Sequence, residues 1–317
     1  MTPRERSEEA RSRRPAPRRV TPLATPALDP DGLMFPLSQQ ECGAIVRAAL
    51  DEDDAFNDVT TIATVLSDRR IRGTLVTRGE GVICGVTLAI ETFRMLDPKV
   101  SIRVDADDGS YVTRGTSVLY LTGHARGLLS AERVALNFMQ HLSGIATLTR
   151  KYVEAIAGTR AQILDTRKTL PGWRKLEKYA VSAGGGVNHR MNLSAAVLVK
   201  DNHIAAVDGD IGLAVQRVRQ FAPGRKIEVE CDGIDQVKQA LESGADIILV
   251  DNMPPSRIRE CVELVKGRAI VEASGGVRLD NVREIAETGV DWVSIGKLTH
   301  SAPALDLALD FDLAPLR

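Results

Sequence analysis

Hydrophobic residues recur at helical spacing from Ser38 onward, and this serine is placed to cap a helix that carries Ile45, Ala49 and Leu50 on one face. Short runs rich in apolar and β-branched residues follow, with turn signals such as Asp-Asp-Gly between them. The first part of the chain therefore has an α+β pattern. Beyond the first helix, it is predicted to contain helices at about 85–95 and 131–149 and strands at 71–77, 81–84, 100–104 and 117–122.

Beyond Gly158 the pattern changes to short apolar runs that alternate with stretches of helical periodicity. Such alternation is typical of parallel strands joined by crossover helices. The interiors of the runs are nearly all apolar, as expected for strands that are buried on both faces. The pattern predicts strands at 162–165, 196–200, 227–231, 246–251, 269–274 and 292–296, and helices at 173–182, 211–221, 234–243, 256–266 and 281–288.

A polar or glycine-containing cluster stands at the carboxyl end of each predicted parallel strand. In an α/β barrel these ends converge on one mouth, where active sites lie. A doubly wound open sheet would spread them along a line, and it usually carries Gly-x-Gly-x-x-Gly after its first strand, which this chain lacks. We therefore expect an α/β barrel that is incomplete, with six or seven strands. The clusters are Asp165-Thr-Arg-Lys168, Lys200-Asp-Asn-His203, Glu230, Asp251-Asn252, Ser274-Gly-Gly276 and Gly296.

The composition excludes several classes of protein. The 317 residues include 41 basic and 42 acidic side chains, and a net charge of −1 argues against a protein that coats nucleic acid. No apolar run reaches the roughly 18 to 20 residues that span a bilayer, and the N-terminus lacks the apolar core of a signal peptide. The four cysteines lie far apart, without metal-ligand spacing. We expect a cytoplasmic protein with neither a nucleic-acid nor a membrane partner.

An Arg- and Pro-rich tail occupies residues 1–32. Its first 20 residues hold seven arginines against three glutamates and almost nothing apolar, so we expect this tail to be disordered. A transit peptide and a nucleic-acid arm are the functional alternatives. The three glutamates argue against an acid-poor transit sequence.

The clusters at the barrel mouth are strongly charged. Arg and Lys side chains bind carboxylates and phosphates, so the predicted cavity is suited to an anionic ligand. Two carboxylates on successive strands, Glu230 and Asp251, could hold Mg²⁺, largely through water, on a phosphorylated substrate. Their alternative role is a salt-bridge network that satisfies the cations. The cationic candidates are Arg133, Arg167, Lys168, His189, Arg190 and Lys200.

Glycines mark a second part of the predicted mouth. Ser274-Gly275-Gly276 follows the penultimate strand and Gly296 ends the last one, where barrels commonly bind phosphate through backbone amides. A tight turn is the alternative. The run 184–186 is three glycines, which indicates either a closely approached or mobile backbone or a flexible hinge.

Histidines divide into one candidate and several structural residues. His189 is a candidate proton donor or carboxylate ligand, whereas His124, His141 and His203 are expected to make ordinary hydrogen bonds. Cys84 and Cys231 lie inside apolar strands, and they are expected to be small buried hydrophobes.

These motifs together resemble the quinolinate phosphoribosyltransferase family of NAD biosynthesis, in order and over about residues 38–301. The matching segments are Glu132-Arg133-Val-Ala-Leu-Asn137, Ser143-Gly-Ile-Ala-Thr147, Asp165-Thr-Arg-Lys-Thr169, Gly184-Gly-Gly-Val-Asn-His-Arg190, Lys200-Asp-Asn-His203, Ser274-Gly-Gly276 and Leu298-Thr-His-Ser301. The resemblance implies an N-terminal α/β sandwich domain at 33–144 and an incomplete barrel at 145–300. It also implies a homodimer, or a larger assembly, with active sites shared between subunits. We expect residues 301–317 to return to the N-terminal domain.

The reaction implied by this resemblance joins quinolinate to phosphoribosyl pyrophosphate with Mg²⁺, giving nicotinate mononucleotide, pyrophosphate and CO₂. It assigns Arg133 of the neighbouring subunit, with Arg167, Lys168, His189 and Arg190, to quinolinate, and it places Lys200 between the two substrates. Glu230 and Asp251 would hold the ribose hydroxyls and the metal through water. Ser274, Gly275, Gly276 and Gly296 would bind the 5′-phosphate, with Thr166, Ile295 and Lys297 also in contact with substrate. Lys168, Lys200, Glu230 and Asp251 are the catalytic residues that it implies.

The chemistry agrees with such a pocket, because two anionic substrates would repel each other without dense cationic compensation. The quaternised ring nitrogen accepts the electrons left by CO₂, so no organic cofactor is expected. One departure is Lys297, which stands where the family usually carries a small residue. Two alternatives remain open: a related phosphoribosyltransferase for another heterocyclic acid, and a catalytically silent barrel that binds a partner through its basic tail.

Overall fold

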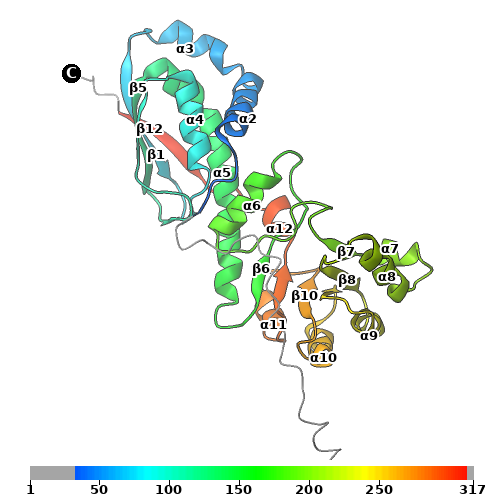
Figure 1. Cartoon of the computed structure of the whole chain (residues 1–317). Helices are drawn as coiled ribbons and strands as arrows, with labels where there is room; N and C mark the ends of the chain where they lie inside the picture. Colours follow the sequence, from blue (N-terminus) through cyan, green and yellow to red (C-terminus); the bar gives the residue numbers. More distant parts are fainter. Residues whose placement is uncertain (1–32, 313–317) are drawn as a thin grey trace, which may run out of the picture.

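The computed structural model describes residues 33–312, which form two domains joined by a long helix (Figure 1). The predicted disordered tail at 1–32 and the last residues, 313–317, lie outside the described residues. Among the helices in the described range, none combines the length and the apolar character needed to cross a membrane.

The N-terminal domain is built on an antiparallel sheet whose strand order is β12–β1–β5–β3. A separate pair of short strands, β2 and β4, lies beside it. The buried side chains of β1 alternate with more exposed ones, because successive residues of a strand point to opposite faces. The strands are β1 (Arg70–Thr77), β2 (Gly81–Val82), β3 (Ser101–Val104), β4 (Tyr111–Val112), β5 (Ser117–His124) and β12 (Leu307–Asp312).

Helices cover one face of this sheet (Figure 1). The first of them confirms the predicted cap: the Ser38 side chain accepts a hydrogen bond from the Glu41 backbone, and the Glu41 carboxylate accepts one from the Ser38 backbone. The elements are α2 (Gln39–Glu52), the 3₁₀ turn η1 (Ala55–Asn57), α3 (Val59–Thr64), α4 (Val86–Leu96) and α5 (Ala125–Ala155).

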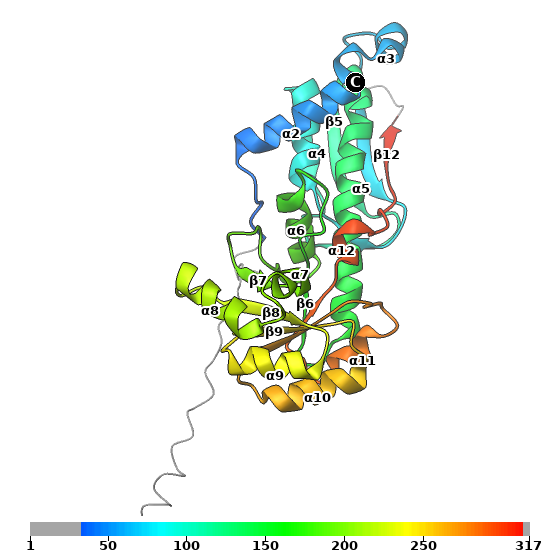
Figure 2. The same cartoon turned by 90° about the vertical axis from the view of Figure 1, so that its right-hand side faces the viewer.

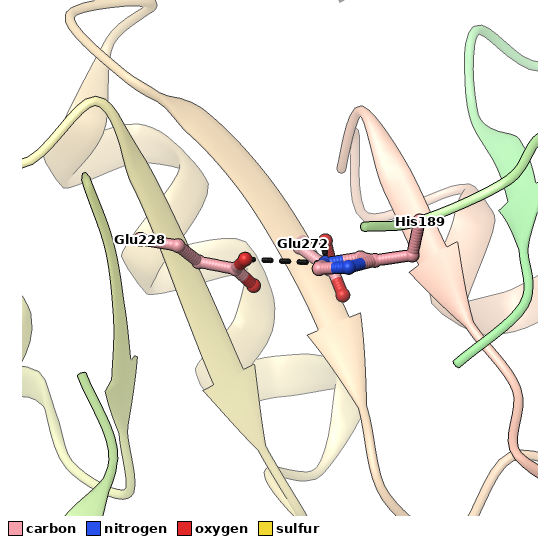
Figure 3. Close-up of side chains that lie close together, drawn as sticks. All are labelled: His189, Glu228 and Glu272. Atoms are coloured by element: carbon pink, nitrogen blue, oxygen red, sulfur yellow. Dashed lines mark ion pairs between the residues drawn. The ribbon is translucent and has the colours of Figure 1, made fainter. Parts of the chain in front are cut away.

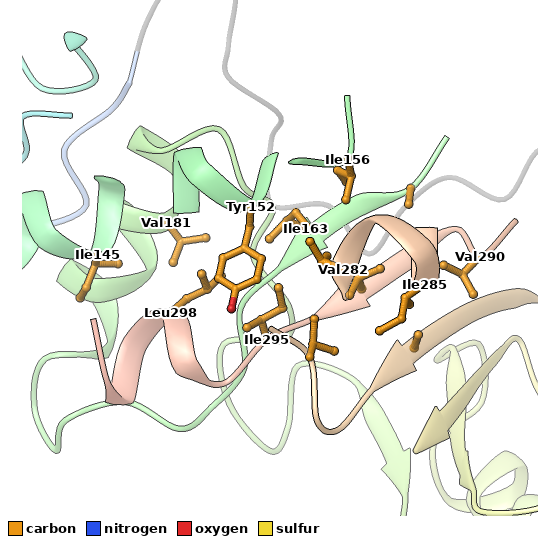
Figure 4. Close-up of a cluster of buried hydrophobic side chains, with 14 of the residues drawn as sticks. Ile145, Tyr152, Ile156, Ile163, Val181, Val282, Ile285, Val290, Ile295 and Leu298 are labelled. Atoms are coloured by element: carbon orange, nitrogen blue, oxygen red, sulfur yellow. The ribbon is translucent and has the colours of Figure 1, made fainter. Parts of the chain in front are cut away.

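Helix α5 is the element that links the two domains (Figure 2). It is 31 residues long, whereas the sequence predicted only 131–149, so it passes without a break through the predicted boundary at 144/145. Its last turns carry Ile145, Tyr152 and Ile156 into a buried cluster with Ile163 of the barrel and Leu298 (Figure 4). The two domains therefore share one helix and one continuous core.

The segment after His300 crosses back along α5 before it enters the N-terminal sheet as β12. Gly144 is required at the crossing, because a Cβ there would lie 2.2 Å from the Pro303 carbonyl oxygen. Leu305 donates its backbone N–H to the Gln140 carbonyl at 3.0 Å, and the Gln140 side chain donates to the Leu307 carbonyl at 2.9 Å.

The second domain confirms the predicted incomplete α/β barrel. Its six-stranded parallel sheet has the order β6–β11–β10–β9–β8–β7, so neighbours in sequence are neighbours in space and the first strand pairs with the last. Only the ladder between β6 and β7 is missing, and this missing ladder leaves the barrel open. The strands are β6 (Gln162–Leu164), β7 (Val197–Val199), β8 (Ile227–Cys231), β9 (Ile247–Asp251), β10 (Ile270–Ser274) and β11 (Trp292–Ser294).

The barrel helices agree with the predicted crossover segments, except for two short helices that follow strands β7 and β11. Those short helices lack a long periodic segment, and the sequence pattern did not predict them. The helices are α6 (Arg174–Ala183), α7 (Asp201–Ala205), α8 (Ile211–Phe221), α9 (Ile234–Glu242), α10 (Pro255–Val265), α11 (Val282–Ala286) and α12 (Lys297–His300).

Candidate active site

A cavity of about 790 Å³ lies at the carboxyl ends of the six barrel strands. All the predicted site residues line it except Arg133. The convergence follows from the barrel, because parallel strands arranged in a cylinder direct their carboxyl ends to one mouth. The predicted residues that line it are Thr166, Arg167, Lys168, His189, Arg190, Lys200, Glu230, Asp251, Ser274, Gly275, Gly276, Ile295, Gly296 and Lys297.

Arg133 lies elsewhere, on the N-terminal half of α5, where it is exposed to solvent. It does not line the cavity of its own chain. Its predicted contact with a neighbouring subunit's substrate stays a prediction.

One side of the cavity is cationic. Arg167, Lys168 and Arg190 all line it, and the Arg167 Nε is buried with no hydrogen-bond partner among the described residues. Burial and then repulsion from Arg167 lower the pKa of Arg190. The two guanidinium groups lie close enough that each makes the charged form of the other less favourable. An anion that binds between them relieves this repulsion.

A buried network holds the backbone behind these cations. The Asp165 carboxylate accepts hydrogen bonds from the His189 backbone N–H and the Asn188 side chain, each at 2.8 Å, and it pairs with the Lys178 ammonium. Burial raises the pKa of Asp165 to about 6, although Lys178 opposes the shift. Lys178 also donates to the His189 carbonyl at 2.9 Å. Residues 188–189 are therefore fixed in place by an ion pair that is closed to solvent.

The glycine run 184–186 is a site of close backbone approach. A Cβ on Gly184 would lie 2.4 Å from the Ala146 carbonyl oxygen, and one on Gly186 would lie 2.8 Å from Thr149 and Val181 side-chain atoms. The run therefore packs directly on α5, and this contact favours a closely approached backbone over a flexible hinge.

His189 lines the cavity, and the tip of its ring is directed at two glutamates that the sequence analysis missed (Figure 3). Its Nε2 is 3.1 Å from the Glu228 carboxylate and 3.5 Å from the Glu272 carboxylate. The side chains of both glutamates are about 1% exposed. Burial lowers the pKa of His189, but the two carboxylates outweigh it and raise that pKa to about 10. Burial and the neighbouring Glu272 raise the pKa of Glu228.

The expectation that the strand interiors are nearly all apolar is wrong at these two positions. Glu228 lies on β8 and Glu272 on β10, and both are buried inside the barrel. Burial of these carboxylates inside the barrel is tolerated because a cationic partner, the His189 ring, lies beside them. A signal for both was present, since Glu228 stands two residues before Glu230 and Glu272 two residues before Ser274, and such pairs face the same side of a strand.

The predicted phosphate loop is formed by backbone that passes close to its neighbours. Gly275 has φ +83°, and a Cβ there would lie 2.3 Å from the Asn252 Oδ1 and 2.8 Å from the Asn252 backbone nitrogen. A Cβ on Gly296 would lie 2.9 Å from the Lys168 side chain. Glycine is required at these positions because neighbouring atoms lie too close for a Cβ. The backbone of these glycines lines the cavity.

Glu230 and Asp251 end neighbouring strands β8 and β9. Glu230 lies 3.2 Å from the Lys200 ammonium, and Asp251 accepts a hydrogen bond of 2.6 Å from the Asn252 side chain. Two carboxylates at an open mouth, without a closed protein cage, match the way Mg²⁺ is commonly held through one or two carboxylates, water and substrate phosphate. The donor set therefore suits this metal.

Three other histidines, His124, His141 and His203, confirm their predicted structural roles. His124 pairs with Asp97 at 3.2 Å, His141 with Glu177 at 2.9 Å, and the His203 Nδ1 accepts the Lys200 backbone N–H at 3.0 Å. The cysteines at 42, 84, 231 and 261 are free and buried.

Comparison with known proteins identifies the family to which this chain belongs. Residues 58–143 match the model of the N-terminal domain of quinolinate phosphoribosyl transferase, and residues 145–310 match the model of its C-terminal domain. The chain belongs to the quinolinate phosphoribosyltransferase family. A family relative, the nicotinate-nucleotide pyrophosphorylase (carboxylating) of Mycobacterium leprae, is 45% identical over 273 residues, covering 84% of this chain and 95% of the relative.

Further members of the quinolinate phosphoribosyltransferase family show similar agreement. The probable nicotinate-nucleotide pyrophosphorylase (carboxylating) of Bacillus subtilis is 41% identical over 264 residues, covering 83% of this chain and 91% of the relative. The crystal structure of the nicotinate-nucleotide pyrophosphorylase from Ehrlichia chaffeensis superposes with a TM-score of 0.82 at 41% identity, covering 87% of this chain and 99% of that one.

In this quinolinate phosphoribosyltransferase family member, the cavity is also lined by residues that the sequence analysis did not predict for the site. Most follow predicted residues directly or share their strand, so the predicted cavity was correct and its inventory was incomplete. They are Leu198, Leu249, Glu272, Val277, Arg278, Ser294 and His300, whereas Asn252 also lines the cavity and belongs to the predicted Asp251-Asn252 cluster.

Proposed function

We propose that the protein joins quinolinate to phosphoribosyl pyrophosphate with loss of CO₂, giving nicotinate mononucleotide and pyrophosphate in NAD biosynthesis. One observation carries the proposal: a single cavity holds the cations Arg167, Lys168 and Arg190 together with the strand-end carboxylates Glu230 and Asp251. The cations suit a dicarboxylate acceptor, and the carboxylates suit a cationic transition state beside it.

The acceptor would bind at the cationic side. Quinolinate carries two carboxylates, and planar guanidinium groups bind such groups in bidentate fashion. Arg167 and Arg190 line the cavity, and their mutual repulsion is relieved when a dianion enters. We assign the phosphoribosyl group to the opposite side, with its 5′-phosphate at Ser274, Gly275, Gly276 and Gly296.

The transfer step would begin when the quinolinate ring nitrogen attacks the anomeric carbon of the ribose as the bond to pyrophosphate breaks. The transition state has oxocarbenium character, and we assign its stabilisation to the Glu230 and Asp251 carboxylates. Lys200, which is 3.2 Å from Glu230, would lie between the two substrates and bind the leaving pyrophosphate.

Decarboxylation would follow on the quaternised ring. The bond to the carboxylate beside the ring nitrogen breaks, CO₂ leaves, and the electron pair stays on the ring carbon, where the adjacent positive nitrogen stabilises it. One proton then takes the place of the carboxylate. We assign its delivery to the ammonium group of Lys168 or Lys200, both of which line the cavity.

Mg²⁺ is part of the proposal, held through water by Glu230 and Asp251. When bound, it would compensate the charge of the pyrophosphate group. We expect no organic cofactor, since the pyridinium formed in the reaction is itself the electron acceptor.

We further propose a homodimer in which Arg133 of each subunit completes the neighbour's site. Arg133 is exposed and does not line the cavity of its own chain, and Val59 and Leu66 of the N-terminal domain are 77% and 75% exposed. A cytoplasmic location is the last part of the proposal, supported by the four free, buried cysteines.

The test is release of CO₂ from carboxyl-labelled quinolinate by the purified protein, with and without phosphoribosyl pyrophosphate and Mg²⁺. Release that requires both compounds is the expected result. No release from well-folded protein would contradict the proposal and favour another heterocyclic acid as acceptor. Deletion of residues 1–32 tests the silent-barrel alternative, because an enzyme with a passive tail keeps its turnover whereas a tail-driven binder loses its partner.

A further inference from the structure

The open edge of the barrel is filled by residues 187–190. Val187 donates its backbone N–H to the Ile163 carbonyl at 2.8 Å and accepts from the Asp165 backbone at 3.2 Å, so the segment lies along β6 where the ladder to β7 is missing. From there His189 reaches across the barrel interior to Glu228 of β8 and Glu272 of β10 (Figure 3). These contacts join the segment at the opening to the far wall of the barrel.

The two nitrogens of the His189 ring have different partners. Nδ1 lies 2.8 Å from the Arg190 backbone nitrogen, and Nε2 lies 3.1 Å from the Glu228 carboxylate and 3.5 Å from the Glu272 carboxylate. The three side chains are close enough to share a metal ion, but here Nε2 is directed at both carboxylates. Among the described residues, both Glu228 oxygens and the Glu272 Oε2 accept no hydrogen bond, so ion pairs hold the ring.

The His189 ring also fixes the position of the Arg190 backbone. The Arg190 backbone N–H is bound to the His189 ring, and the Arg190 Nη1 donates to the Ala196 carbonyl at 3.0 Å, while its side chain lines the cavity. Rotation of the His189 ring would release the first of these contacts. Both ring nitrogens have protein partners, and because the ring also lines the cavity, its position affects the site directly and through Arg190.

We propose that Glu228 and Glu272 are positioning residues that hold the His189 ring and, through it, place the Arg190 guanidinium for the acceptor acid. This inference rests on the proposed function, and it extends that function to two buried side chains, of which Glu272 also lines the cavity. It predicts a selective effect, because the segment that the two glutamates hold, residues 187–190, is separate in the chain from the phosphate loop at residues 274–276 and Gly296.

The test is steady-state kinetics of the full chain with each substrate varied. Glu228→Ala and Glu272→Ala should each raise the KM for quinolinate about tenfold, as expected when one buried ion pair that holds the ring is lost. The KM for phosphoribosyl pyrophosphate should change less than about twofold. Glu228→Gln and Glu272→Gln retain an accepting oxygen, so they should recover most of the affinity for quinolinate. If the alanine variants do not fold, the aspartate variants withdraw the carboxylate from the ring and carry the same expectation.

A matched control is Asp97→Asn, which alters another buried carboxylate paired with a histidine, but in the N-terminal domain. It should lower thermal stability without changing either KM. Equal increases in both KM values in the glutamate variants, or no change in folded variants, would overturn the inference. One equivalent of Zn²⁺ bound by the wild type in equilibrium dialysis and lost in Glu272→Gln would also overturn it. Failure of the proposed function is distinguishable, because it would appear as an inactive wild type.

Discussion

The Lys200 ammonium lies 3.2 Å from the Glu230 carboxylate, so residues that follow β7 and end β8 share an ion pair inside the cavity. In the proposed reaction Glu230 also faces the ribose. Its removal should therefore affect the donor substrate more than the acceptor.

We predict that Glu230→Gln lowers kcat/KM for phosphoribosyl pyrophosphate about 100-fold, because the developing positive charge on the ribose loses its carboxylate. Asp251→Asn should act in the same direction. Initial rates with each substrate varied measure both effects. Glu242→Gln, an exposed change on α9, is the control and should leave the rates unchanged. Unchanged kinetics in both site variants would refute the roles given to the two carboxylates.

Mixed dimers test the shared site. Arg133→Ala and Lys200→Ala should each have little activity alone, whereas their mixture after subunit exchange should regain about a quarter of wild-type activity. Half of the random dimers are hybrids, and each hybrid has one intact site. Turnover before and after exchange measures the recovery. No recovery in dimers with confirmed exchange would mean that Arg133 acts within its own chain or not at all.

Gly275→Ala should weaken phosphoribosyl pyrophosphate use about tenfold or more, because the new Cβ overlaps Asn252 and moves the loop, and φ +83° is strained for alanine. Gly224→Ala is the matched control, since it has φ +79° and nothing within 4 Å of the added Cβ. The control separates the cost of backbone strain from displacement of the loop. Equal KM values for the two variants would argue against phosphate binding at Gly275.

The pH dependence of stability can be tested at Asp97. Burial raises the pKa of this carboxyl, but hydrogen bonds from the backbone and side chain of His124 prevail, so its pKa is lowered overall. A carboxyl with a lowered pKa in the folded state stabilises the protein above its unfolded pKa of about 4, and that stability is lost as the pH falls through the folded value. Asp97→Asn should reduce the free energy of unfolding by about 1 to 3 kcal/mol at pH 7.

The difference between Asp97→Asn and wild type should narrow as the pH falls below about 4, because protonation then removes the same charge from the wild type. Denaturant unfolding at a series of pH values measures it. A constant difference at all pH values would contradict the role given to the charge.

The strands and the cavity could be predicted from sequence, because runs such as Ile247–Asp251 are apolar until the last residue and parallel strands direct these last residues to one place. Glu228 and Glu272 could not be predicted in the same way. Their burial depends on His189, which comes from a segment outside the regular pattern, and only the folded barrel brings the three together. The C-terminal end of α5 was predicted too early because its final turns gain their stability by packing on the barrel.

Helix α5 also limits how the molecule can move. At about 1.5 Å per residue, its 31 residues make a rod of roughly 46 Å that begins in one domain and ends in the core of the other. A hinge between the domains would have to break this rod, so the distance from Arg133 to the base of the barrel is fixed within each subunit. In the proposed dimer, any adjustment of one subunit's arginine to the other's substrate would then require a rigid shift of whole subunits, and the loops at the barrel mouth would have to enclose the reactants.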